Sequence, residues 1–157
     1  MALPNEKFEE IKSKIQNFID NEMVVHEDDF NINHKFADHL PFLEEKRNKV
    51  REMGLFAPQI SKEYGGLGLS LHQLGQIYEI LGKTFYGLYV FNCQAPDAGN
   101  MEILIEHGTD YQKETFLKPL VEGKVRSCFS MTEPEFAGSN PVIMLSLIHI
   151  SEPTRHK

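Results

Sequence analysis

The sequence predicts a mainly α-helical domain that leads into one β-strand. Through most of the chain before Gly123, apolar side chains recur every three or four residues, which is the period of a helix with one buried face. Ser70 and Thr109 each stand three residues before a glutamine, the pattern of a capping box at the start of a helix. Only the stretch Arg126–Thr132 alternates with a period of two residues, which is typical of a strand.

The helices are expected to form a bundle, and prolines, glycines and capping residues indicate their limits. They are expected at about Pro4–Asn21, Pro41–Met53, Ser70–Gly82 and Phe85–Ala95, around Met101–Ile105 as far as Gly108, and from Thr109 to about Glu122. Phe85–Ala95 is apolar nearly all round, so we expect it at the centre of the bundle. Pro119 is expected to kink the last helix or to end it early.

The segments between the helices are expected to be loops and turns. His26–Asp29 is polar and acidic and is expected to be a loop, whereas Asn33–His39 is expected to hold a short helical turn. Leu55–Ile60 is expected to be extended, because its proline disfavours the helical region for Ala57. Gly65-Gly66-Leu67-Gly68 is expected to form a turn that leads into the next helix.

Length, charge and cysteine usage narrow the class of protein. The 157 residues suit one domain, which would bury roughly 70% of the surface of its unfolded chain. The net charge of −7 argues against nucleic acid or an anionic membrane as a partner. No apolar run approaches the ~20 residues of a membrane helix, and no signal or transit pattern opens the chain. Cys93 and Cys128 stand alone, so an intracellular, soluble protein is expected.

Three patterns that often carry chemistry have plainer explanations here. Gly82-Lys83-Thr84 lacks the first glycine of a phosphate-binding loop, because Ile77 occupies that position, and a helix end followed by a turn explains it better. Gly65-Gly66-Leu67-Gly68 does not have the spacing of a dinucleotide fingerprint. No two histidines stand four residues apart, so no metal site is expected.

The stretch Cys128–Asn140 is the best candidate for a functional site. It begins as a strand, breaks at Thr132-Glu133-Pro134 and ends in the small residues Gly138-Ser139-Asn140. Such a loop offers backbone N–H groups and hydroxyls at close range, as a flat, phosphorylated cofactor requires. From spacing alone, a generic passage from strand to loop remains the favoured explanation.

Four motifs, in order along the chain, resemble those of the acyl-CoA dehydrogenase family. They are Glu63-Tyr64-Gly65-Gly66-Leu67-Gly68, His107-Gly108-Thr109-Asp110-Tyr111-Gln112-Lys113, Leu120-Val121-Glu122-Gly123-Lys124, and Met131-Thr132-Glu133-Pro134 followed by Gly138-Ser139-Asn140. The segments Phe91-Asn92-Cys93, Ala95-Pro96-Asp97 and Gly99-Asn100-Met101 are most similar to the subgroup of family members ten and eleven. The resemblance covers the chain up to about Met144.

The resemblance implies how the chain is divided. The family fold has an N-terminal helical domain, a middle β-barrel domain and a C-terminal four-helix bundle. Residues 1–125 would be the helical domain, and residues 126–144 would open the middle domain with its flavin-binding loop. Residues 145–157 resemble a translated sequencing adapter and are expected to be an artefactual tail on a truncated chain; a genuine C-terminal tail is the alternative.

The resemblance also implies an activity, the FAD-dependent α,β-dehydrogenation of an acyl-CoA thioester. A carboxylate removes the α-proton, hydride passes to the flavin, and an electron-transferring flavoprotein or another acceptor such as oxygen takes the electrons. That carboxylate belongs to the family's C-terminal domain, so no catalytic residue is assigned and this fragment is expected to be inactive. A homo-oligomer is expected for the full-length protein, in the cytoplasm of a bacterium or in the mitochondrion or peroxisome of a eukaryote.

By the same resemblance, five residues would contact the cofactor. Phe129, Met131 and Thr132 would lie along the flavin ring, while Gly138 and Ser139 would approach the flavin and Ser139 also the thioester side of the substrate. The common family form, Thr-Glu-Pro-Gly-Ala-Gly-Ser-Asp, is one residue shorter and ends in Asp rather than Asn. The apolar helix expected at Phe85–Ala95 would wall the acyl-chain pocket or simply pack in the core. A small helical interaction module without a cofactor is the alternative function.

Overall fold

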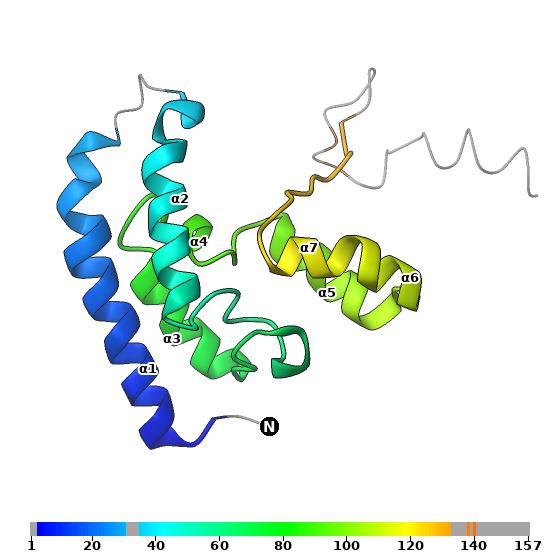
Figure 1. The fold of residues 1–157 in the computed structure, drawn as a ribbon, viewed down its shortest axis with the longest axis horizontal. Coiled ribbons are helices and arrows are strands. Elements are labelled where there is room, and N and C mark those ends of the chain that lie inside the picture. Colours follow the sequence, from blue (N-terminus) through cyan, green and yellow to red (C-terminus); the bar gives the residue numbers. More distant parts are fainter. Residues whose placement is uncertain (1–2, 31–34, 133–137, 139, 141–157) are drawn as a thin grey trace, which may run out of the picture. The chain divides into compact units, whose positions relative to one another are not determined.

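The computed structural model describes residues 3–30, 35–132, 138 and 140 (Figure 1). The chain divides into two compact units, Met1–Ser127 and Cys128–Lys157. Every element assigned in the described residues is helical, which confirms the predicted fold class. In order, these elements are α1 (Asn5–Phe18), η1 (Ile19–Met23), η2 (Val24–Asp29), α2 (Phe36–Glu52), η3 (Lys62–Tyr64), α3 (Leu71–Leu81), α4 (Gly87–Val90), α5 (Asp97–His107), α6 (Asp110–Gln112), η4 (Lys113–Leu117) and α7 (Lys118–Val121).

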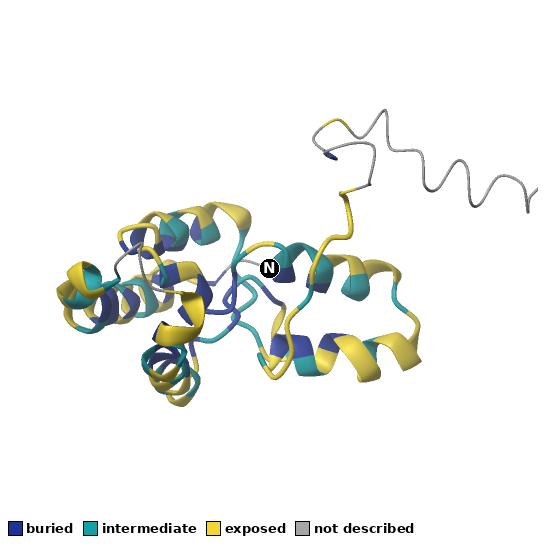
Figure 2. Ribbon diagram, turned by 90° about the horizontal axis from the view of Figure 1, so that it is seen from above, coloured by how far each residue is buried: buried dark blue, intermediate teal, exposed yellow. Residues whose placement is uncertain are grey.

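The first unit contains two apolar clusters. The larger one lies between α1, α2, α3 and α4 and includes Phe8, Ile15, Leu43, Val50, Ile77, Leu81, Val90 and Phe91. The smaller one joins α5, η4 and α7 to the turn that follows α2, through Ala57, Ile60, Met101, Leu117, Leu120 and Val121. Figure 2 shows the buried residues on the facing sides of the helices and the exposed residues on their outer sides. Burial of one face of each helix supplies the main stabilisation of this unit.

Local signals predict several helix limits correctly. At the start of α3, the Gln73 N–H donates to Ser70 Oγ over 3.3 Å and the Ser70 N–H donates to Gln73 Oε1 over 3.1 Å. Thr109 and Gln112 form the same capping box before α6. Beyond α2, Gly54 adopts φ +69°, which glycine accommodates without a Cβ clash. The capping-box predictions are therefore confirmed.

Two predicted limits near the N-terminus are wrong. His26–Asp29 is not a loop but part of the 3₁₀ helix η2, which continues from α1 through the π-helical turn η1. Helix α2 begins at Phe36, five residues before the predicted Pro41, which lies inside the helix. Asp38 explains the earlier start, because its carboxylate accepts the Lys35 N–H over 2.9 Å and so caps the first turn.

Two further predictions fail where distant parts of the chain bond to each other. The predicted helix Phe85–Ala95 is reduced to the single turn α4, because Asn92 adopts φ +57° and ends it. Its central residues are buried as expected, but Phe85 is 75% exposed. Ala57 is not extended: it adopts φ +50°, its N–H donates to the Phe91 carbonyl over 2.9 Å, and its own carbonyl closes a turn to Ile60.

The last helical stretch bends through a π-helical turn before its proline. The Lys118 N–H, at the end of η4, donates to the Lys113 carbonyl five residues earlier. Pro119 has no N–H to offer, and α7 ends at Val121 before Gly123, which adopts φ +68°. The predicted end of this helix near Glu122 is confirmed. No helix in the described residues is long and apolar enough to cross a membrane.

Candidate functional site

The second unit begins at Cys128, within the stretch Arg126–Thr132 that is predicted to be a strand. Residues 128–132 carry neither a helix nor a strand assignment, so the predicted strand is not seen there and its pairing into a sheet stays a prediction. Phe129 is 52% exposed and Met131 is 42% exposed. Phe129 and Met131 are thus exposed apolar side chains two positions apart in the sequence. Thr132, also exposed, places a hydroxyl at the end of the same stretch.

Gly138 is the described residue at which the loop returns to this stretch. It adopts φ +73°, and a Cβ on it would lie 2.4 Å from the Met131 carbonyl oxygen and 3.4 Å from the Thr132 nitrogen. Only glycine allows this approach without displacing the backbone. The structure thus brings Gly138 together with Met131 and Thr132. Ser139, the remaining predicted site residue, lies outside the described residues, and the roles of all five stay predictions.

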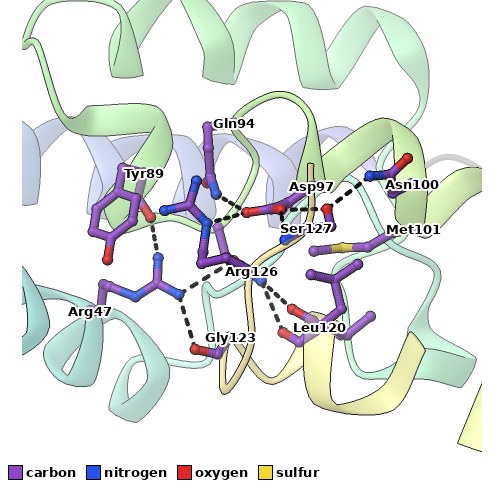
Figure 3. A network of polar contacts seen from close by, with 12 residues as sticks. Arg47, Tyr89, Gln94, Asp97, Asn100, Met101, Leu120, Gly123, Arg126 and Ser127 are labelled. Carbon is purple, nitrogen blue, oxygen red and sulfur yellow. Dashed lines mark hydrogen bonds and ion pairs between the residues drawn. The ribbon is translucent and has the colours of Figure 1, made fainter. Parts of the chain in front are cut away.

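Asp97 is the centre of a polar network at the end of the first unit (Figure 3). Its side chain is fully buried at the start of α5. Oδ1 accepts the Ser127 N–H over 2.7 Å and the Ser127 hydroxyl over 2.6 Å. Oδ2 accepts Arg126 Nε over 2.5 Å and also the side-chain amide of Gln94. Asn100, one turn along α5, donates its Nδ2 to Ser127 Oγ over 2.8 Å.

This network stabilises the ionised form of Asp97. Burial raises the pKa of the Asp97 carboxyl, but the hydrogen bonds from Ser127 and the charge and hydrogen bond of Arg126 outweigh that effect and lower the pKa below its usual range. The carboxylate also lies at the N-terminus of α5, where the helix dipole favours negative charge. The buried charge is thus compensated by donors from residues 126 and 127.

A second buried network holds the chain a few residues earlier. Arg47, on α2, is 1% exposed and donates to the Tyr89 carbonyl over 2.5 Å and to the Gly123 carbonyl over 3.4 Å. The central carbon of its guanidinium lies 4.5 Å from the centre of the Tyr89 ring. Its Nε forms an ion pair with Glu44 Oε1 at 3.2 Å. Asn92 donates its Nδ2 to two carbonyls at the end of α7, those of residues 120 and 121, each over 3.1 Å.

The two networks together hold the connection from α7 to the flavin-loop candidate. The Arg47 network fixes Gly123, and the Asp97 network fixes Arg126 and Ser127. Arg126 also stacks with its guanidinium carbon 5.1 Å from the centre of the Tyr89 ring. Ser127 is the last residue of the first unit. Its backbone N–H and its hydroxyl are both held by hydrogen bonds to Asp97 of α5.

Two hollows border these networks within the first unit. One, of about 860 Å³, is lined by Glu44, Asn48, Arg51, Phe56, Tyr64 and Gly123, among others. The other, of about 390 Å³, is lined mainly by apolar side chains of α5, η4, α7 and the residues after it, including Ile103, Leu104, Phe116, Leu120 and Val125. No group of three or more histidine, cysteine or acidic residues in the described part of the chain could hold a metal ion.

The sequence did not identify the residues of the Asp97 network. Asp97 and Ser127 are 30 residues apart, and no motif spacing links them. A weak signal was present, because Arg126 and Ser127 are the first two residues of the predicted strand and Asp97 follows Pro96. Asp97 lies in a segment that resembles the family subgroup, but that resemblance implies no role for it.

Comparisons with known proteins agree with the fold. Residues 5–124 match the family model described as acyl-CoA dehydrogenase, N-terminal domain. Acyl-CoA dehydrogenase family member 10 of Mus musculus is 43% identical over 106 residues, which cover 64% of this chain and 10% of that protein. Acyl-CoA dehydrogenase family member 11 of Gallus gallus is 45% identical over 107 residues, which cover 66% of this chain and 13% of that protein.

A solved structure gives the same result. The chain matches a protein of Mycobacterium abscessus that is described as an acyl-CoA dehydrogenase, with a TM-score of 0.72 and 34% sequence identity, over 89% of this chain and 37% of that one. This chain therefore spans only a minor part of the length of the relatives it matches. From the family match and the shared fold, it belongs to the acyl-CoA dehydrogenase family and carries the family's N-terminal helical domain.

Proposed function

We propose that this chain is the N-terminal part of an FAD-dependent acyl-CoA dehydrogenase, which oxidises the Cα–Cβ bond of an acyl-CoA thioester. The observation that carries the proposal is the match of residues 5–124 to the family's N-terminal domain. The matched regions make up only 10% and 13% of the mouse and chicken relatives that are named for this activity. Substrate, electron acceptor and oligomeric state are therefore proposed for the whole protein rather than for these 157 residues.

The described residues of the loop have the chemistry that a flavin requires. Phe129 and Met131 offer exposed apolar side chains, which suit the face of a planar ring. Thr132 adds a hydroxyl, and the close approach of Gly138 to Met131 keeps the loop free of side-chain bulk at that point. We infer that Phe129, Met131, Thr132 and Gly138 hold the cofactor, with Ser139 on the side of the thioester.

Within this arrangement the chain binds and orients but removes no proton. Bound FAD would supply the hydride acceptor. The loop would orient the ring and shield one side of it from water, and the resemblance assigns the proton-abstracting carboxylate to the family's C-terminal domain. We propose an acyl-CoA substrate, an electron-transferring flavoprotein or another acceptor as redox partner, and a homo-oligomer as the working form.

The proposal is tested by expressing the chain together with its downstream coding sequence. The purified protein is expected to be yellow, to show flavin absorbance, and to lose that absorbance when an acyl-CoA is added without an electron acceptor. An extended protein that never retains FAD would overturn the proposal. The 157-residue chain alone is expected to show no turnover of acyl-CoA, and turnover by it would contradict the assignment of the base to another domain.

The apolar hollow beside α5 favours a second candidate, a helical module that binds another polypeptide without a cofactor. Ile103, Phe116 and Val125 line it and are exposed. A group of exposed apolar side chains that line one hollow is typical of a surface that binds another protein. This candidate predicts a colourless extended protein, whereas the dehydrogenase predicts a yellow one, so the same preparation separates the two.

A further inference from the structure

The Asp97 carboxylate accepts its hydrogen bonds from side chains and backbone that lie outside α5. Three of the four groups that donate to it belong to Arg126 and Ser127, and the fourth belongs to Gln94. An acidic residue at the start of a helix usually satisfies that helix's own first N–H groups. Here the carboxylate instead binds the chain about 30 residues later, immediately before residues 128–132.

We propose that Asp97 is a positioning residue for the flavin loop: by holding the backbone of Ser127, it fixes where and in which direction the chain enters the segment that carries Phe129, Met131 and Thr132. This inference rests on the proposed flavin-binding role of that segment. Asp97 itself is not proposed to touch cofactor or substrate.

The geometry gives the carboxylate control over both position and rotation at Ser127. Oδ1 accepts the Ser127 N–H and hydroxyl together, at 2.7 and 2.6 Å, so one oxygen constrains the main chain and the side chain of the same residue. Asn100 donates to the same hydroxyl, which leaves that side chain little freedom to turn.

The neighbouring residue is held as well, which makes the anchor two residues long. Arg126 donates Nε to Oδ2, and its guanidinium lies against the Tyr89 ring. The backbone of Gly123 is fixed separately by Arg47. The chain between residues 123 and 127 is therefore held at both ends by side chains from other helices, and Asp97 provides the hold nearest to the loop.

An ionised carboxylate is required for this role rather than a buried polar group in general. The anchor needs two acceptor oxygens, one for Ser127 and one for Arg126 and Gln94. Asn in place of Asp97 keeps one acceptor oxygen for Ser127 but presents an N–H₂ group to the donors on the other side. Ala removes both acceptors. The two substitutions therefore separate the Ser127 contact from the Arg126 contact.

The first arm of the test uses the 157-residue chain. Amide hydrogen exchange at Ser127 is expected to be at least about tenfold faster in Asp97→Ala than in the wild type, and less affected in Asp97→Asn. The matched control is Gln73→Ala, which removes a buried polar side chain that binds the backbone of Leu3 at the other end of the unit. This control is expected to lower stability without changing exchange at residue 127 selectively.

The second arm uses the protein extended by its downstream coding sequence. Asp97→Asn is expected to weaken FAD binding about tenfold and to change the visible circular dichroism of the flavin. Ser127→Ala, which keeps the backbone donor, is expected to change both less, and Gln73→Ala neither. A merely structural role for Asp97 would lower stability but leave the flavin spectrum unchanged.

Two outcomes would overturn the inference in different ways. If the wild type is yellow but Asp97→Asn, Asp97→Ala and Ser127→Ala match Gln73→Ala in FAD affinity and flavin spectrum, Asp97 does not position the loop although the proposed function stands. If the extended wild type retains no FAD, the proposed function fails and this inference fails with it.

Discussion

The two buried polar networks of the first unit differ in the groups that they satisfy. Arg47 and Asn92 donate to backbone carbonyls, mainly those at and just beyond the end of α7. Asp97 accepts instead, from one backbone N–H and from side chains just before the second unit. The final carbonyls of a helix have no partner within it, so the first network completes a helix end. The second network holds a segment that belongs to no helix.

This difference separates stability from positioning. Loss of Arg47 or Asn92 leaves buried carbonyls without donors, which costs stability throughout the first unit. Loss of Asp97 releases the entry to the loop but leaves the two apolar clusters complete. We therefore expect the first network to dominate the free energy of unfolding and the second to dominate the properties of the loop.

The largest loss of stability is expected for Arg47→Met. The substitution keeps apolar volume but removes the donors to the carbonyls of Tyr89 and Gly123 and the charge beside Glu44. We expect the free energy of unfolding to fall by about 3 kcal/mol, measured by urea denaturation. The control is Arg51→Ala on the next turn of α2, whose guanidinium bonds Asn48 and stacks on the Phe56 ring; its expected cost is below about 1 kcal/mol. Equal costs for the two arginines would contradict the distinction.

A smaller loss is expected for Asn92→Ala, and it has two separable parts. The substitution removes both bonds to the end of α7 and places alanine at φ +57°. We expect a cost of about 2 to 3 kcal/mol. Asn92→Gly keeps the conformation at lower strain but loses the same bonds, so its cost should be smaller by about 1 kcal/mol. If the glycine variant were the less stable of the two, backbone strain would not contribute.

The same long-range bonds explain which parts of the fold could be predicted from the sequence. The capping boxes at Ser70 and Thr109 involve residues three apart, so a local pattern contains all the information. The helix predicted at Phe85–Ala95 stops because Asn92 bonds residues 28 and 29 positions later. Ala57 likewise departs from its local preference where it bonds Phe91. The conformation that local propensity predicts is overridden where buried polar groups form hydrogen bonds with residues far away in the sequence.

The candidate site divides in the same way. The loop residues stand close together in the sequence, so one family motif is enough to predict them as a group: Phe129, Met131, Thr132, Gly138 and Ser139. The anchor of that loop comes from α5, and its ion pair and hydrogen bonds join residues 29 and 30 positions apart. Neither composition nor periodicity records such a pair. Only the packed structure places Asp97 against Ser127.

The stability that Asp97 contributes is expected to depend on pH. Its pKa is lowered in the folded protein, so its contribution is complete above the unfolded value of about 3.9 and is lost as the pH falls through the lower, folded value. The difference in unfolding free energy between wild type and Asp97→Asn should be constant above about pH 5 and shrink below about pH 4. Urea denaturation of both proteins across this range checks the sign. A difference that grows on acidification would show that the carboxyl is protonated in the folded state.

The smallest effect on stability is expected for Ser127→Ala, because the backbone donor to Asp97 remains. The substitution removes one hydrogen bond to the carboxylate and the acceptor for Asn100. A cost of about 1 kcal/mol is expected by urea denaturation, well below that of Arg47→Met. Asn100→Ala, measured in parallel, removes only the second of those bonds, so the difference between the two variants isolates the bond between the Ser127 hydroxyl and Asp97. If Ser127→Ala cost as much as Arg47→Met, the Asp97 network would be a main support of the first unit, and the separation between a stabilising network and a positioning network would fail.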